Sequence, residues 1–511
     1  MNRTFFTLIS RIFAGAAVVL GLTAGQALAN AEFVIVNNNA PGIGFNDPTP
    51  ATPVGGNAGT TLGEQRLIAY RRALDLWGSV LKSDVTIYVI GTFGPFDPSD
   101  CDASGGVLAS AGALQIFANF PNAPKEDVWY GVALANALAG EDLAPGDPES
   151  DIYAADIVAQ FNGGIGTPNC IANSTWYYGL DNNAPSGVDA QGRPRMFAPG
   201  TYDGGSSVSH WDVSLFANQL MEPDISGDLI HSVAVPADLT GSQLRDVGWA
   251  FNPVGDVNFF VRQHYLDFLN REPDANGLAF WRDDVFGCGV DKACAEVKRV
   301  NVSAAFFLSI EFQQTGNLVY KMHKAGFGNL AGQPVAVRRA DFLNDVRTIG
   351  STPAQVIVGQ GDWERQLEAN KQAFALAFVQ RPAFQSAHGG QSAADYVDSL
   401  FANVGVQPAA AERQAAVAAF GGGGASGQAA ALRSVTESNS ATAKTFNEAF
   451  VLMQYFGYLQ RDPDAAPDAD FGGYNFWLSK LNEFNGNFIA AEMVKAFITS
   501  TEYMDRFGSR L

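Results

Sequence analysis

Hydrophobic and polar positions follow a helical period through the second half of the chain. From about Asp256 onward, apolar residues recur every three to four positions over long stretches that short turns interrupt. One such stretch places Val261, Tyr265, Phe268 and Leu269 on a single face, at i, i+4, i+7 and i+8. A helix with one apolar face must bury it, so this half is predicted to be all-α.

The preceding residues, 30–250, show a different pattern. They are rich in Gly, Pro, Asn and Asp, and they contain short strand-like runs at 33–36 and 85–90. Between these runs, residues 63–82 carry apolar side chains at helical spacing, which indicates an amphipathic helix packed on a sheet. The predicted fold class is therefore an α+β N-terminal domain followed by an all-α region.

The helical half repeats itself. The segment FVRQHYLDFLNREPD (260–274) aligns without gaps on FVLMQYFGYLQRDPD (450–464), and GLAFW (277–281) matches GYNFW (473–477). In both copies R-[ED]-P-D is predicted to end the apolar helix, because proline disfavours the helical conformation in the residue before it and Asp can cap the next helix. The match continues where Phe306, Ser309, Glu311 and Phe312 correspond to Phe497, Ser500, Glu502 and Tyr503.

The N-terminus has the pattern of an export signal. Arg3 and Arg11 precede the apolar run 12–22, and Ala27 and Ala29 form an A-x-A site just before Asn30. The run is short for a membrane span, so cleavage after Ala29 is expected, with an uncleaved anchor as the alternative. No other stretch approaches 18 consecutive apolar residues, so no transmembrane segment is expected after cleavage.

These patterns divide the chain into a series of units. A weaker third copy of the repeat is indicated by the helical run 396–401 and by QRPAF at 380–384, and the glycine run 421–424 has the composition of a flexible link. The expected units are the signal peptide 1–29, the front domain 30–250, the first helical unit 256–348, a degenerate middle unit 353–420, the Gly-rich link 421–430 and the second helical unit 440–511.

Four cysteines fit an exported chain. Cys288 and Cys294 are six apart and can close a small loop, which leaves Cys101 and Cys170 to pair with each other in the front half. An even count without any C-x-x-C spacing favours disulfides over a metal site. The formal net charge of −20 argues against nucleic acid or an anionic membrane as a partner, because no basic patch is visible.

The most specific motif is SSVSHWDVSLFANQLMEP at 206–223. Together with LRDVGW at 244–249, it resembles the C-terminal part of leishmanolysin-type metzincins and of related secreted bacterial zinc peptidases. The resemblance implies that His210 is the third zinc ligand and that Met221 forms the Met-turn beneath the metal. It extends over roughly 32–250, and the helix 63–82, the strand 85–90 and the segments 152–157 and 175–180 occur in the order that it implies.

The sequence departs from that family in the residues that would bind the zinc ion. A zincin needs H-E-x-x-H on a helix, because positions i and i+4 direct two imidazoles to one zinc ion while the Glu serves as general base. The chain has five histidines, at 210, 231, 264, 323 and 388, and neither H-E-x-x-H nor H-x-x-E-H occurs. Only 181–208, a loop-like stretch, stands where the resemblance places the zinc-binding helix, so the helix is interpreted as deleted and no catalytic residue is identified.

Two further readings concern the helical half. It resembles a helical repeat domain of unassigned function that is common in exported bacterial proteins and similar to phycobilisome linker domains, which says nothing about chemistry. The acidic turn DPDAAPDAD, with Asp462, Asp464, Asp468 and Asp470, has alternate carboxylates of the kind that bind Ca²⁺. Its spacing is not that of an EF-hand, and Asp beside Pro is also ordinary turn chemistry.

Three functional hypotheses follow from the sequence. The leading one is an exported, non-catalytic peptidase-like pseudoenzyme, secreted or periplasmic, whose helical repeats bind an extracellular protein or a cell-surface component without a cofactor. The second is a secreted zinc metallopeptidase, active through unrecognised ligands or truncated in its gene model. The third is a calcium-dependent structural or adhesion protein. No G-x-S-x-G, Walker A or Rossmann motif supports another enzyme class.

Overall fold

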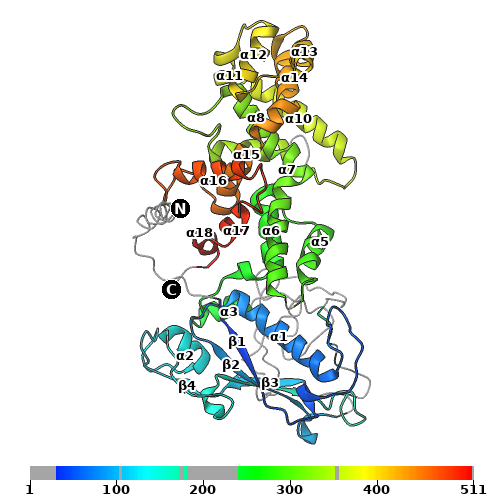
Figure 1. Cartoon of the computed structure of the whole chain (residues 1–511), viewed down its shortest axis with the longest axis vertical. Coiled ribbons are helices and arrows are strands. Elements are labelled where there is room, and N and C mark those ends of the chain that lie inside the picture. The colour runs from blue at the N-terminus through cyan, green and yellow to red at the C-terminus, as the bar shows by residue number, and fades with distance from the viewer. Residues whose placement is uncertain are drawn as a thin grey trace, which may run out of the picture.

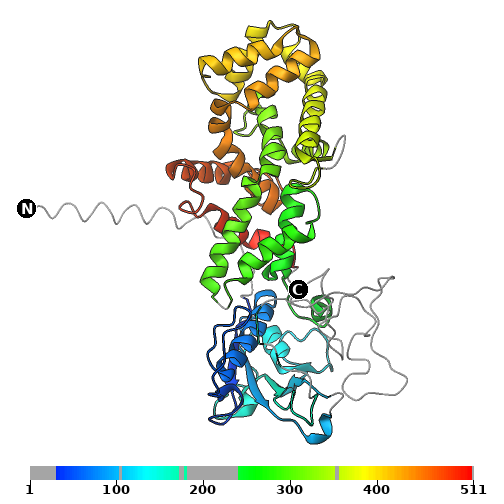
Figure 2. The same ribbon diagram turned by 90° about the vertical axis from the view of Figure 1, so that its right-hand side faces the viewer.

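The computed structural model describes residues 30–102, 106–171, 176, 178–180, 240–289, 291–351 and 356–508. The molecule is elongated in both views (Figures 1 and 2). A small mixed sheet with its helices forms one end, and helices stack in two further layers along the long axis. The coarse expectation of an α+β part followed by an all-α part is confirmed.

The front sheet has four strands in the order β1-β2-β6-β3. Strands β1 (Phe33–Asn37), β2 (Ile87–Gly94) and β6 (Ile157–Asn162) are mutually parallel, and the edge strand β3 (Ala109–Ala113) runs antiparallel to β6. Helix α1 (Leu62–Val80) packs on this sheet. Parallel neighbours require crossover connections, and α1 supplies the one between β1 and β2.

Helix α1 begins where the sequence predicts, for a local reason. Thr61 and Glu64 form a capping box, in which the Thr61 side chain accepts from the Glu64 amide and the Glu64 carboxylate accepts from the Thr61 amide. These bonds satisfy backbone donors that the first helical turn leaves unpaired. The expected helix at 63–82 therefore differs from α1 by only one or two residues at each end.

Shorter elements complete the front domain. Strands β4 (Ile116–Phe117) and β5 (Tyr130–Gly131) form a separate antiparallel hairpin, and α2 (Val132–Ala139) follows directly and packs against it. The remaining elements are the 3₁₀ turns η1 (Gly44–Asn46), η2 (Pro98–Asp100), η3 (Ile152–Ala154) and η4 (Pro253–Gly255) and the helix α3 (Thr240–Asp246).

The two halves meet beside the C-terminal end of α1. The Lys82 amide donates to the Ala250 carbonyl at 2.8 Å, and the Asn252 amide donates to the Val80 carbonyl at 2.6 Å. On the other side, the Asn252 side-chain amide donates to the Met504 carbonyl at 2.9 Å. The junction is thus held by hydrogen bonds from three distant parts of the chain.

A small disulfide loop adds to this junction. Cys288 and Cys294 are bonded to each other, and within their loop the Gly289 carbonyl accepts from the Arg72 guanidinium at 3.1 Å. The front domain and the first helices of the helical half therefore touch through a covalently closed loop as well as through the connecting chain.

The helical half shares one hydrophobic core, which extends from Val254 to Tyr503. Its elements are α4 (Val257–His264), the π-turn η5 (Tyr265–Leu269), α5 (Ala275–Phe286), α6 (Lys292–Leu308), α7 (Ile310–Gln314), α8 (Gly316–Phe327), α9 (Arg339–Ser351), α10 (Trp363–Val379), α11 (Pro382–His388), α12 (Ala393–Val404), α13 (Ala410–Phe420), α14 (Gly424–Thr436), α15 (Asn439–Gln454), the π-turn η6 (Tyr455–Leu459), α16 (Gly472–Glu483), α17 (Met493–Ile498) and α18 (Thr501–Asp505). None of the described helices is long and apolar enough to cross a membrane.

The two clear sequence repeats share an unusual backbone feature. In each, the first helix widens into a π-turn of five residues, η5 or η6. Each π-turn ends in a residue with left-handed backbone angles, Asn270 (φ 54°) or Gln460 (φ 57°). The helix therefore stops before the R-[ED]-P-D motif, so proline does not end it. The two π-turns also contact each other, with the Phe268 and Tyr458 rings 5.1 Å apart and edge-to-face.

The expected units do not correspond to separate packing layers. Helices α4–α7 pack in the middle layer with α15–α18, whereas α8 reaches into the layer of α10–α14 (Figure 1). Every residue from Gly316 to Gly326 of α8 is buried, because other helices of the half surround it. The expected first unit, 256–348, is thus divided between two layers.

The structure corrects the expectation of a Gly-rich link at 421–430. The structure has only a turn at 421–423, after which α14 begins at Gly424 and packs closely against α13. The glycines serve this packing, since a Cβ at Gly427 would overlap the carbonyl oxygen of Phe420. Composition alone could not distinguish a tight helix–helix turn from a flexible link.

Candidate functional site

The predicted zinc-site residues fall outside the part of the chain that the structure describes. His210 and Met221 both lie in 181–239, as does the stretch 181–208 where a zinc-binding helix was sought. The remnant zinc site stays a prediction. The described front-domain residues nevertheless show what surrounds the sheet and α1.

A cavity of about 550 Å³ lies between α1 and the sheet. Its wall is largely aromatic and aliphatic, and the described lining residues include no His, Asp, Glu or Cys. The guanidinium of Arg66 lies 4.3 Å from the centre of the Phe93 ring and also donates to Asp47 at 3.1 Å. Thr240, Leu244 and Trp249 also line the cavity.

The polar group of this cavity that stands out is the Tyr70 hydroxyl. It is buried and has no hydrogen-bond partner among the described residues. Burial raises the pKa of Tyr70 well above its usual value, so the hydroxyl stays protonated. The described wall can accommodate an apolar group, and it offers no acid–base pair for catalysis.

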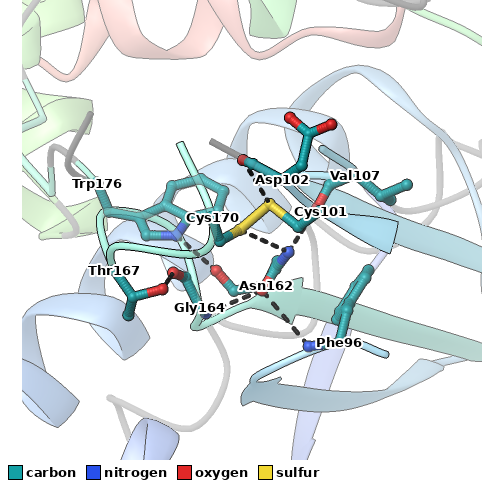
Figure 3. The surroundings of a disulfide bond; sticks show 9 residues. All are labelled: Phe96, Cys101, Asp102, Val107, Asn162, Gly164, Thr167, Cys170 and Trp176. Atoms are coloured by element: carbon teal, nitrogen blue, oxygen red, sulfur yellow. Dashed lines mark hydrogen bonds between the residues drawn. A yellow bond between two sulfur atoms is a disulfide. The ribbon is translucent and has the colours of Figure 1, made fainter. Parts of the chain in front are cut away.

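Asn162, at the end of β6, organises the loops around the front disulfide (Figure 3). Its side-chain amide donates to the Val107 carbonyl at 2.9 Å, and its backbone carbonyl accepts from the Trp176 indole at 2.8 Å. The disulfide between Cys101 and Cys170 links these loops covalently, and the two Cα atoms are 5.1 Å apart. Both disulfides therefore have the pairing that the cysteine spacing predicts.

The described histidines lie apart from one another, each with its own partners. His323 Nε2 is 2.8 Å from the Asp345 carboxylate, and His388 Nε2 is 2.7 Å from the Gly326 carbonyl. His264 is fully buried, and loss of solvation lowers its pKa to about 3, so its ring is neutral. Among the residues that the structure describes, no three His, Cys, Asp or Glu side chains are arranged to hold a metal ion.

The acidic turn after the second repeat helix does not assemble as a calcium site. Each of its four carboxylates accepts from a different donor: Asp462 from the Arg339 amide, Asp464 from the Arg338 guanidinium, Asp468 from the Arg461 guanidinium and Asp470 from the Gly472 amide. Guanidinium groups match carboxylates in shape and charge, and turn amides readily bond Asp side chains. Each of the four carboxylates therefore already has a protein donor, and the described residues contain no group of three ligands suited to a metal ion.

The arginine of each R-[ED]-P-D motif contacts several other residues of its own repeat. Arg271 donates two bonds to Glu311, both of 2.8 Å, and Arg461 binds Glu502 in the same bidentate way. Each guanidinium also lies over the tyrosine that begins its own π-turn, at 5.0 Å and 5.3 Å from the ring centre. The ion pair thus joins the end of the first helix of each repeat to the S-x-E-F segment, which is SIEF at 309–312 and STEY at 500–503.

The two repeats also expose the same aromatic residue. Phe280 on α5 is 65% exposed, and Phe476 on α16 is 57% exposed. Each ring stands edge-to-face against the following tryptophan, 4.9 Å from Trp281 and 5.0 Å from Trp477. These tryptophans are partly buried and pack on Phe306 and Phe497 at the edge of the core, whereas the two phenylalanines are exposed.

Sequence reasoning missed both features, although a signal for each was present. The Arg of R-[ED]-P-D and the Glu of S-x-E-F recur together in the two copies, and a recurring opposite-charge pair predicts contact. The phenylalanine of G-x-x-F-W also recurs, but helical spacing alone does not tell whether it faces the core or solvent.

Comparison of this chain with known protein families, curated proteins and solved structures found no match.

Proposed function

We propose that this is an exported, non-catalytic, peptidase-like protein whose helical half binds an extracellular protein or a cell-surface component. The observation that carries the proposal is the exposure of Phe280 and Phe476 at equivalent positions of the two repeats. Core packing explains the other recurring aromatic residues, which are buried or, in the case of the two tryptophans, partly buried against the core. An exposed phenylalanine contributes nothing to that core, and aromatic residues are enriched in the centres of protein interfaces.

Export is supported by the leader-like N-terminus and by both disulfides, which form and persist in oxidising compartments. The absence of H-E-x-x-H from the sequence supports a non-catalytic front domain, since a catalytic zinc normally takes three protein ligands.

Binding is tested by incubating the purified protein with intact cells of its source and measuring the fraction that sediments with them. The double variant Phe280→Ser/Phe476→Ser is expected to bind at least ten-fold more weakly than the wild type, as loss of two aromatic contacts predicts. Val297→Ser, at an exposed apolar position on α6, is the matched control and should bind like the wild type. Equal binding by the double variant would refute the proposal.

The non-catalytic part is tested separately on the same preparation. Zinc content is measured by elemental analysis, and casein cleavage is followed with and without a chelator. Substoichiometric zinc and no chelator-sensitive cleavage are expected. About one zinc per chain together with chelator-sensitive cleavage would establish the zinc peptidase instead, since a catalytic site holds one such ion.

A further inference from the structure

The β4–β5 hairpin of the front domain has an inner and an outer face of opposite character. Tyr130 points inward, is 8% exposed and packs edge-to-face on Phe120 at 5.4 Å. Its neighbour Trp129 is 66% exposed, and Ile116, opposite Gly131 on β4, is 57% exposed. Side chains alternate along a strand, so Ile116 and Trp129 belong to the same outward face.

The hairpin loop holds this face rigidly. Asn119 and Asp127 bond each other reciprocally: the Asn119 side-chain amide donates to the Asp127 carboxylate at 3.1 Å, and the Asp127 amide donates to the Asn119 side-chain oxygen at 2.8 Å. Packing of Tyr130 in the core fixes the other side. A tryptophan presented on a pre-ordered hairpin loses little conformational entropy when a partner covers it.

The turn η3 lies close to the hairpin and also exposes apolar side chains. The Gln115 side chain, one residue before Ile116, donates to the Tyr153 carbonyl at 2.7 Å, which places η3 beside the hairpin. Ile152 and Tyr153 of that turn are 50% and 58% exposed. Large apolar side chains grouped on neighbouring segments of a surface mark interaction sites more often than single ones do.

The segment of the chain that contains the hairpin and η3 is strongly acidic. Between 115 and 153 the chain has a single basic residue, Lys125, and seven exposed carboxylates: Glu126, Asp127, Glu141, Asp142, Asp147, Glu149 and Asp151. The hairpin loop contributes Glu126 and Asp127, which shortly precede Trp129 in the chain. Carboxylates beside an apolar centre favour a partner of opposite charge.

We propose that the outward face of the β4–β5 hairpin, centred on Trp129 and Ile116, binds a basic segment of a partner protein that carries apolar side chains between lysines or arginines. The carboxylates attract the basic groups, and Trp129 covers an apolar side chain. A second copy of this chain fits poorly, because the same carboxylates would then lie opposite one another. An anionic membrane or a nucleic acid is repelled for the same reason.

The probe is a synthetic, fluorescently labelled peptide of alternating lysine and leucine, titrated into the purified protein and followed by anisotropy. Binding is expected at low salt, and it should weaken as sodium chloride is raised because exposed charges are screened. Trp129→Ser is expected to lower affinity about ten- to thirty-fold, the loss typical of a central aromatic contact. Val297→Ser, at an exposed apolar position of the helical half, is the matched control and should bind the peptide like the wild type.

Four results would overturn the proposal. Equal peptide affinity in Trp129→Ser and wild type would show that the peptide responds only to net charge. Equal binding of a glutamate–leucine peptide would remove the charge argument. Sedimentation showing a dimer that Trp129→Ser dissociates, or Trp129-dependent binding to phosphatidylcholine vesicles, would assign the face to a second copy or to lipid. Each variant is checked for native thermal unfolding, so that misfolding is not read as lost binding.

Discussion

Acidification should weaken the helical half through one buried histidine. His264 lies where η5 meets η6, with its Nδ1 2.7 Å from the Phe260 carbonyl and its Nε2 2.9 Å from the Ser303 hydroxyl. Loss of solvation is the main cause that lowers the pKa of His264 to about 3, and the charges of Arg299 and Arg506 add to it. The folded protein therefore holds this ring neutral.

The direction and size of the effect follow from linkage. Because the folded pKa lies below the unfolded value of about 6.5, protonation favours the unfolded chain, and stability that is full above about pH 6.5 is lost as pH falls toward 3. The slope approaches roughly 1.4 kcal/mol per pH unit. Between pH 7 and pH 4.5 the free energy of unfolding should fall by about 2.5 kcal/mol through His264 alone.

The second repeat supplies the control variant. Gln454 occupies the position equivalent to His264, is equally buried, and donates to the Phe450 carbonyl at 3.1 Å. His264→Gln therefore replaces the ring with a side chain that the same backbone already accommodates and that does not titrate. Urea unfolding of both proteins, followed by the circular dichroism of the helices at pH 7, 5.5 and 4.5, isolates the contribution as a difference.

The wild type is expected to lose about 2.5 kcal/mol more than His264→Gln over this range. Parallel pH profiles for the two proteins would refute the reasoning, because they would show that the folded and unfolded chains bind a proton at this position equally well. A variant that is less stable at every pH but has a flatter profile supports it.

Three other predictions concern stability, each measured by urea unfolding. Gly457→Ala should lower the free energy of unfolding by about 1–3 kcal/mol, because its Cβ would lie 2.5 Å from the Phe268 ring. The control Gly350→Ala has open space around it in α9 and should be neutral or stabilising, so equal effects of the two variants would contradict the close packing of the π-turns. Arg461→Met should lower the free energy of unfolding by about 2–3 kcal/mol, because it leaves Glu502 unpaired. Adding Glu502→Leu should recover part of that loss, and a further loss of stability in the double variant would contradict this explanation. Replacing the cysteines of the front disulfide should cost about 4 kcal/mol, against about 2 kcal/mol for the small loop at the junction, and the reverse order would argue against loop entropy as the cause.

Local sequence signals predicted much of the fold. The helix at 63–82 carries both an apolar period and a capping box, so α1 was recoverable to within two residues. The repeat alignment identified elements that share their backbone geometry, down to the π-turns. Cysteine spacing gave both disulfides. In each of these cases the deciding interaction joins residues close in sequence, or a residue type with few available partners.

Long-range packing was less accessible. The period of α8 predicts a helix, but only the surrounding helices make every side of it buried, and so its layer could not be assigned. The glycines at 421–424 permit flexibility in isolation, and the contact between Gly427 and Phe420 removes it. Carboxylates in the acidic turn suggested calcium because the sequence does not show that Arg338 lies beside Asp464.

The pairing of the two π-turns constrains the order in which the molecule can be completed during synthesis. Phe268 and His264 are made about 190 residues before their partner Tyr458, and Asp267 before Arg506, which binds it bidentately. At typical elongation rates this interval is on the order of ten to forty seconds. During that time the second repeat has not been made, so the apolar end of the first repeat has no partner to pack against. The layer of α8–α14, which is translated in between, can form in the interval, so the centre of the molecule is the last part to close.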